Sequence, residues 1–250
     1  MAANYIFGIH AVDACIRNTP NLIEEIYLDN KRNDARFNQL IDLANSKHIP
    51  LSLVEADKLK QYDQLGSQKV VAKVKPWENN LDLNQALTKL DDDAVVVILD
   101  GITDLHNLGA IIRSCECFGV DLIILPKNNS ANPSNPTVSH VSSGALYAIP
   151  IVIVNNLVSA IDKLKEAGFW ICATALNDKA ISLYEFKPEG KLTWVLGSED
   201  KGIRRLVLDN CDYVVNIPMY GVTQSLNVSV SAGVVLSYTK QARCALIKDS

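Results

Sequence analysis

Strands and helices alternate along the chain from Ala94 onward, and this alternation limits the fold more than any other feature of the sequence. Short apolar runs predict strands at residues 95–99, 122–125, 151–154, 170–175, 192–196 and 213–217. Helical spacing of apolar residues predicts helices at 108–118, 157–166, 203–208 and about 227–243. Strands that are apolar at every position are buried on both faces. We therefore predict an α/β domain whose mostly parallel sheet carries helices on both faces.

The first 75 residues predict a smaller α/β unit with its own core. Its strands are expected at 24–29, 51–54 and 70–74, and its main helix at 35–47. Residues 76–92 open on a proline, are polar and contain only a weak helical pattern near 83–90, so they are predicted to be a linker. We expect a small domain at 1–75 and a larger one at 93–250.

Composition excludes several classes of protein. No apolar run approaches the roughly 18 residues that a membrane span needs. The start of the chain, MAANYIFGIH, lacks the basic and apolar regions of a signal peptide, so we expect a cytoplasmic location. The six cysteines are scattered and form no CxxC pair, which argues against a metal site or a disulfide framework.

The charge distribution permits an RNA partner without requiring one. The net charge is −4, and an acidic chain is not typical of nucleic-acid binding. Residues 1–75 hold 10 Lys/Arg and 9 Asp/Glu, a net charge of 10 − 9 = +1, so residues 76–250 carry −4 − 1 = −5. Basic side chains gather at 31–36 and at 69–75. An ordinary solvated surface explains them as well as RNA does.

Polar segments follow three of the predicted strands, where ligands of parallel sheets bind. They are DGITDLHNLG at 100–109, GSEDKG at 197–202, and PMYGVTQ at 218–224, which leads into SLNVSVSAG. GSEDKG has the spacing of a phosphate loop, but Ile203 and Arg204 replace its Lys-Ser/Thr pair, so a nucleoside-triphosphate site does not fit. No GxGxxG or GxSxG motif is present.

Each polar residue in these segments also has a purely structural explanation. Asn107 would cap a helix that starts at Leu108, and either Ser225 or Asn227 would cap the last helix. Arg113 stands three residues before a glutamate, so the two could form an exposed ion pair on one helix face. Glu199 would be a surface acid in a turn.

Taken together, the three segments resemble the three motifs of the SpoU/TrmH family of RNA ribose 2′-O-methyltransferases. The matching residues are Asp100-Gly-x₅-Asn107-Leu-Gly-Ala-x-x-Arg113, Leu196-Gly-Ser-Glu199-x-x-Gly202, Ile217-Pro-Met219 and Ser225-Leu-Asn-Val-Ser229, in the family's order. The resemblance covers about residues 94–243. Residues 1–75 are similar to the substrate-binding domain of the branch that methylates a guanosine in the peptidyl-transferase region of 23S rRNA.

The resemblance implies a fold, a cofactor and a set of residues. The fold is that of the SPOUT superfamily, in which the C-terminal segment threads a loop to form a trefoil knot. The cofactor is S-adenosylmethionine, and no metal is implied. The matching cofactor-binding residues, which act mainly through backbone groups, are Leu196, Gly197, Ile217, Met219 and Leu226, with Thr174 as a weaker candidate. The matching catalytic residues are Asn107, Arg113, Glu199, Ser225 and Asn227.

Family sites are assembled between two subunits, so the resemblance also implies a homodimer through the catalytic domain, with Asn107 reaching across the interface. The last helix agrees, because its apolar residues surround most of it. An interior helix would look the same. Three other functions stay open: methylation of tRNA by the same chemistry, a non-catalytic RNA-binding scaffold, and a nucleotide-dependent metabolic enzyme on an ordinary doubly wound sheet.

Overall fold

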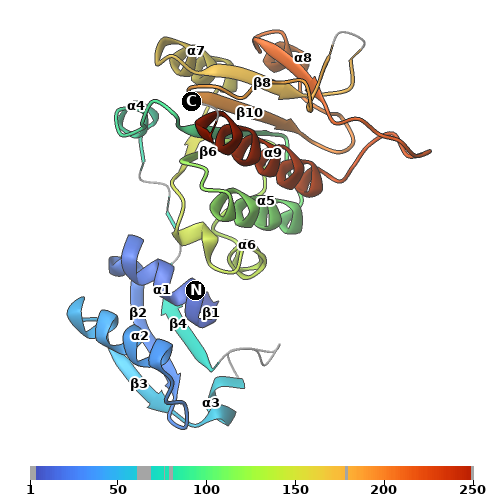
Figure 1. Ribbon diagram of the computed structural model, residues 1–250. Coiled ribbons are helices and arrows are strands. Elements are labelled where there is room, and N and C mark those ends of the chain that lie inside the picture. Colours follow the sequence, from blue (N-terminus) through green and yellow to red (C-terminus); the bar gives the residue numbers. More distant parts are fainter. Residues whose placement is uncertain (1–3, 61–68, 76, 79–80, 178–179, 249–250) are drawn as a thin grey trace. The chain divides into compact units, whose positions relative to one another are not determined.

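The computed structural model (Figure 1) describes residues 4–60, 69–75, 77–78, 81–177 and 180–248. By contacts between residues the chain forms two compact units. Unit 1 comprises Met1–Glu78 and Asn132–Ala148, and unit 2 comprises Asn79–Ala131 and Ile149–Ser250. Residues 76, 79 and 80 of the predicted linker lie outside the described residues, and the rest of it contains α4, Leu83–Leu87, in unit 2. The units differ from the predicted domains chiefly in the place of 132–148.

Unit 1 is built on a four-stranded sheet of order β1-β4-β2-β3. The strands are β1 Asn4–Phe7, β2 Ile23–Asp29, β3 Leu51–Val54 and β4 Val70–Val74; its helices are α1 Ile9–Asn18, η1 Pro20–Leu22, α2 Ala35–Ser46 and α3 Ala56–Lys60. β4 runs antiparallel to β1 and β2, and β3 runs parallel to β2. The core includes Ile16, Ile26 and Phe37, which are almost fully buried.

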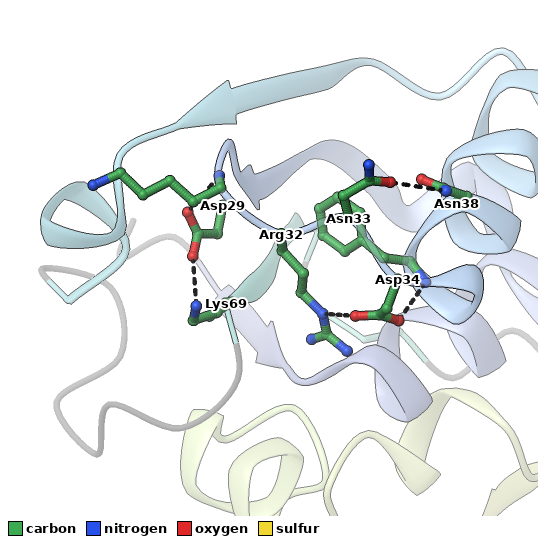
Figure 2. Close-up of polar contacts among 8 residues, drawn as sticks. Asp29, Arg32, Asn33, Asp34, Asn38 and Lys69 are labelled. Atoms are coloured by element: carbon green, nitrogen blue, oxygen red, sulfur yellow. Dashed lines mark hydrogen bonds and ion pairs between the residues drawn. The ribbon is translucent and has the colours of Figure 1, made fainter.

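The connection from β2 to α2 is held by local side-chain bonds (Figure 2). Asp34 caps α2 by accepting a bond from the Phe37 N–H at 3.1 Å, and Arg32 Nε donates to the same carboxylate at 2.5 Å. At the end of β2, buried Asp29 accepts from the Lys31 N–H at 3.0 Å and pairs with Lys69 Nζ at 3.1 Å. Both carboxyl groups therefore have pKa values below the ordinary range, because hydrogen bonds favour the charged form.

Residues 132–148 complete unit 1 although strands of unit 2 flank them in the chain. They contain α6, Pro136–Val141, and the short helix η2, Ala145–Tyr147. Gly144, at φ +83°, lies so close to α1 that an added Cβ would stand 2.3 Å from Ala11 Cβ. Thr19 Oγ1 donates to the Tyr147 carbonyl at 3.4 Å. Burial of Tyr147 raises the pKa of its phenol to about 12.

Unit 2 contains a seven-stranded sheet of order β7-β6-β5-β10-β8-β11-β9, and every neighbouring pair is parallel. Its strands are β5 Val95–Asp100, β6 Leu122–Pro126, β7 Ile151–Val154, β8 Trp170–Thr174, β9 Ile181–Ser182, β10 Leu192–Gly197 and β11 Tyr213–Asn216. The order reverses direction between β5 and β10. Ligands of parallel sheets bind at the carboxyl ends of the strands, which here lie at one edge of the sheet.

Helices cover both faces of this sheet (Figure 1). They are α4, α5 Leu105–Cys117, α7 Leu157–Glu166, α8 Arg205–Leu208 and α9 Val228–Lys248. α4, α7 and α8 pack on one face, while α5 and α9 lie side by side on the other. The buried Trp194 of β10 donates from Nε1 to Thr239 Oγ1 of α9 at 3.0 Å, which ties the last helix to the middle of the sheet.

The predicted fold class is confirmed: a small N-terminal α/β unit precedes a parallel sheet with helices on both faces. The trefoil knot implied by the resemblance stays a prediction. α5 begins at Leu105, three residues before the predicted start, and its N-cap is Asp104, not Asn107. Among the described helices, none combines the length and the hydropathy of a transmembrane span.

Candidate active site

A cavity of about 670 Å³ opens at the carboxyl ends of β8, β10 and β11 in unit 2. Its wall is formed by these strand ends, the segment after β10, and the segment that leads into α9. All six predicted cofactor-binding residues line it: Thr174, Leu196, Gly197, Ile217, Met219 and Leu226. Three of the five predicted catalytic residues line it as well: Glu199, Ser225 and Asn227. Residues from four separate parts of the chain thus meet at one place.

The segment after β10 makes a tight turn against the end of its own strand. Ser198 pairs with Gly202, whose N–H donates to the Ser198 carbonyl at 2.8 Å. Gly202 has φ +63°, a conformation that residues with a side chain rarely adopt. Gly197 must also be glycine, because an added Cβ would lie 2.2 Å from the backbone carbon of Gly202. The two glycines of GSEDKG are therefore required by the close turn.

Glu199 is the centre of a polar network at the edge of the cavity. It accepts hydrogen bonds from the side-chain amides of Asn227 and Asn107, the latter at 3.3 Å, and from the backbone N–H of Val228 at 3.3 Å. Asn227 Nδ2 also donates to Asn107 Oδ1 at 3.0 Å. Glu199 is thus bonded to the first turn of α5 and the first turn of α9.

Asn227 has the capping role that the sequence left open between it and Ser225. Its Oδ1 accepts from the Ser229 N–H at 2.9 Å and from Ser229 Oγ at 2.5 Å, which satisfies an N–H at the start of α9. Ser225, by contrast, lines the cavity. Asn107 bonds to Glu199 of its own chain, so it does not need to cross an interface to join the network.

Arg113 lies apart from this network. It is exposed on α5 and is not among the residues that line the cavity. Arg113 follows Asn107 by six positions in the helix, which places the two side chains about 120° apart around α5 and about 9 Å apart along it. Among the described residues Arg113 forms no ion pair with Glu116, so the structural explanation of that spacing fails.

Asp100 joins the end of β5 to the segment after β10. Its buried carboxylate accepts from the backbone N–H of Arg204 at 2.9 Å and from Arg204 Nε at 2.7 Å. Gly101, at φ +79°, follows directly and turns the chain toward α5. The sequence motif contained Asp100, but nothing in the sequence indicated its partner.

Several lining residues were not predicted. Lys201, Ile203, Asn216 and Ser231 all face the cavity. Lys201 lies within GSEDKG and Ile203 directly follows it, so the sequence motif already indicated this segment. Asn216 ends the apolar strand β11, and no motif indicated it. Among the described residues, Asn216 Oδ1 is buried and has no hydrogen-bond partner. No group of three or more His, Cys, Asp and Glu side chains in the described part of the chain is placed to hold a metal ion.

The chain is similar to known methyltransferases in sequence and in fold. The protein named 23S rRNA (guanosine-2′-O-)-methyltransferase RlmB from Neisseria meningitidis serogroup B is 39% identical over 239 residues, which are 95% of each chain. The protein of the same name from Nitrosomonas europaea is 42% identical, over 95% of this chain and 91% of its own length. The SpoU methyltransferase AviRb from Streptomyces viridochromogenes, solved with AdoMet, superposes with a TM-score of 0.75. It is 21% identical over 96% of this chain and 90% of its own, which shows a shared fold.

Two protein families match nearly the whole chain between them. Residues 5–79 match the family described as RNA 2′-O ribose methyltransferase substrate binding. Residues 94–237 match the family described as SpoU rRNA Methylase, and this range contains every residue of the cavity and of the network around Glu199. The chain therefore belongs to the SpoU rRNA methylase family.

Proposed function

We propose that this protein transfers a methyl group from S-adenosylmethionine to a ribose 2′-hydroxyl of RNA, and that its target is a guanosine in the peptidyl-transferase region of 23S rRNA. The observation that carries the proposal is that residues of the second and third family motifs line one cavity, while Asn107 of the first motif is hydrogen-bonded to Glu199 at its edge. The identity of 39–42% with proteins named RlmB, over nearly the whole chain, supports the 23S rRNA target.

The cavity suits S-adenosylmethionine in size and in the groups it offers. Its volume of about 670 Å³ lies within the roughly 300–1,000 Å³ of small-molecule sites. Leu196, Gly197 and Ile217 line the cavity at or beside strand ends, where backbone N–H and C=O groups can hold an adenine ring. Apolar side chains of Met219 and Leu226 can cover its faces. Bound there, the cofactor supplies a methyl group already activated by its sulfonium.

The protein's part in the reaction is alignment and charge stabilisation. The 2′-hydroxyl must approach the methyl group in line, and its oxygen gains negative charge as it attacks. Arg113 is the candidate to stabilise that charge or to hold the neighbouring phosphate, because a guanidinium stays protonated. Glu199, Asn107 and Asn227 hold the starts of α5 and α9 together beside the cavity.

A homodimer explains why the proposed catalytic arginine lies outside the cavity of its own chain. Arg113 is exposed on α5, and α5 packs beside α9, whose Val230 is 49% exposed. If two copies pair through this α5–α9 face, Arg113 of one copy reaches the cavity of the other. The residue supplied by the partner is then Arg113, not Asn107.

Unit 1 is proposed to supply affinity for RNA. Residues 5–79 match the substrate-binding family. Residues 1–75 carry a net charge of +1, whereas residues 76–250 carry −5. An enzyme that acts on ribosomal RNA works where ribosomes are made, so a cytoplasmic location is part of the proposal.

The test is methyl transfer from labelled S-adenosylmethionine to 23S rRNA that lacks the modification, followed by mapping of the modified nucleotide. We expect one 2′-O-methylguanosine in the peptidyl-transferase region. Transfer to tRNA alone would keep the chemistry and overturn the target. Failure to bind S-adenosylmethionine in a calorimetric titration would overturn the enzyme and favour a scaffold.

A further inference from the structure

We propose that Arg204 is a positioning residue, which holds the cavity wall formed by residues 198–203 in place through the carboxylate of Asp100. The contact between Arg204 and Asp100, called the clamp below, exists in the protein without any ligand. Its effect on S-adenosylmethionine rests on the function proposed above.

The pair joins a buried carboxylate to an arginine whose side chain is 52% exposed. Asp100 is 1% exposed, and a buried carboxylate needs hydrogen bonds that replace its lost water. One Asp100 oxygen accepts from the Arg204 N–H at 2.9 Å and the other from Arg204 Nε at 2.7 Å. Arg204 therefore contributes both its backbone and its side chain to one partner.

Asp100 also fixes the opposite end of the same segment. In the sheet, Asp100 of β5 is the register partner of Gly197 of β10, the residue that opens the turn. Arg204, which closes the turn and precedes α8, is held by the Asp100 side chain. A single residue of β5 thus holds both ends of the turn, and the Ser198–Gly202 pair braces its middle.

The held segment carries the parts of the wall that face the ligand. Glu199, Lys201 and Ile203 line the cavity, and Glu199 extends from this segment to the start of α9. Arg204 is not itself among the lining residues. It acts on the site through the position of its neighbours, and its loss should loosen the wall without removing a contact to the ligand.

The two residues that follow each other here provide a matched pair of variants. Arg204→Gln removes the charged donor to Asp100. Arg205→Gln removes the same charge from the next residue, whose side chain is 94% exposed and pairs only loosely with Asp209, at 3.7 Å. Arg204→Lys keeps the charge and one donor, and it serves as the conservative rescue.

The first measurement needs no ligand. Amide hydrogen exchange of the free protein reports local opening of the turn, chiefly at Gly202 and Arg204, whose N–H groups are bonded to Ser198 and Asp100. We expect exchange at these amides to be about tenfold faster in Arg204→Gln, with partial recovery in Arg204→Lys and no change in Arg205→Gln. Unchanged exchange in Arg204→Gln, with its melting temperature also unchanged, overturns the clamp.

The second measurement separates positioning from RNA contact. For Arg204→Gln we expect the KM for S-adenosylmethionine to rise about tenfold while kcat at saturating cofactor and the KM for rRNA stay near wild type. A raised KM for rRNA with unchanged cofactor affinity would mean that Arg204 touches RNA and would overturn the proposal. If the wild-type protein binds no S-adenosylmethionine, the proposed function fails, and the exchange rates still decide the clamp. Should Arg204→Gln not fold, Arg204→Lys gives the same comparison, with a smaller effect expected.

Discussion

The side-chain amide of Asn227 donates a hydrogen bond to Asn107 Oδ1 at 3.0 Å and so joins two residues that stand 120 positions apart in the chain. The same amide donates to Glu199, whose carboxylate also accepts the N–H of Val228 in the first turn of α9. Because a helix N-terminus carries partial positive charge, a carboxylate is favoured there. The starts of α5 and α9 are thus joined through one acid beside the cavity.

Glu199→Gln tests whether this charge matters. The variant keeps the length of the side chain but weakens the bonds that Glu199 accepts from Asn107, Asn227 and Val228. We expect the Kd for S-adenosylmethionine to rise about tenfold, equivalent to about 1.4 kcal/mol, by isothermal titration. Glu116→Gln on the exposed side of α5 is the control, with no change expected. Equal affinities in both variants would remove Glu199 from the cofactor site.

Gly197→Ala tests the close turn behind the cavity. The new methyl group would lie 2.2 Å from the Gly202 carbon, which is backbone and cannot rotate away. We expect a loss of stability of about 1–3 kcal/mol and loss of cofactor binding. In Gly221→Ala nothing lies within 4 Å of the added Cβ, so that variant should behave as wild type in thermal melts and titrations. A Gly197→Ala protein with normal affinity would show that the turn is not packed as described.

Asp29→Asn tests a buried charge in unit 1. The pKa of Asp29 is lowered chiefly by the hydrogen bond from the Lys31 N–H, and also by Lys69. The charged carboxylate therefore stabilises the fold at pH values above the unfolded-state pKa. This stabilisation is lost as the pH falls through the lower folded-state pKa. Lys69 is mostly exposed, which limits the ion pair, and we expect the variant to be about 1 kcal/mol less stable at pH 7. Urea melts should show this difference shrinking below about pH 4. A difference that persists at pH 2 would assign the effect to packing instead of charge.

Much of this fold could be predicted because its strands are short, continuous and apolar. The predicted runs at 51–54, 70–74 and 151–154 and the helix at 157–166 coincide with β3, β4, β7 and α7. The two-residue strand β9 escaped prediction because a pattern needs several residues to be recognised. α6 escaped because its sequence, PTVSHV, has only one turn of helical spacing after a proline.

The site was predictable in its residues but not in its connections. The motifs indicated which strand ends carry chemistry, since parallel strands end at one edge of a sheet. The bond from Glu199 to the start of α9 and the pair between Asp100 and Arg204 join parts of the chain that no periodicity relates. The packing of residues 132–148 in unit 1 could not be predicted for the same reason, because the contact between Gly144 and Ala11 joins distant parts of the chain.

A fragment that begins at residue 81, and so keeps α4, tests the division of labour between the units. The cavity is lined by unit 2 alone, so the fragment should bind S-adenosylmethionine with a Kd within about threefold of the whole protein and should fail to methylate 23S rRNA. Residues 132–148 would lose α1 and β1 as packing partners, so limited proteolysis should cut the fragment there first. Full methylation by the fragment would show that unit 1 is not needed for RNA.

The last prediction concerns the shared site. Arg113→Ala should abolish methylation with cofactor affinity nearly unchanged, because Arg113 does not line the cavity. Asn107→Ala should also be inactive, through the loss of its bonds to Glu199 and Asn227. If Arg113 serves the partner's cavity, a mixed dimer of the two variants holds one site with both residues mutated and one site with both intact. Mixing the inactive proteins should then restore up to about a quarter of wild-type activity, since random exchange makes half the dimers mixed and each of those has one working site of two.

The control is a mixture of Arg113→Ala with Arg113→Ala,Asn107→Ala, in which no dimer has an intact site and no activity should return. Sedimentation at micromolar concentration should show a species near twice 27.4 kDa. Recovery in the first mixture alone would place one of the two residues across the interface, and because Asn107 is bonded to Glu199 of its own chain, that residue would be Arg113. No recovery, although mass spectrometry confirms mixed dimers, would mean that Arg113 acts within its own chain. A monomer with full activity would contradict the shared site altogether, because then Arg113 could only reach the cavity by a rearrangement of α5.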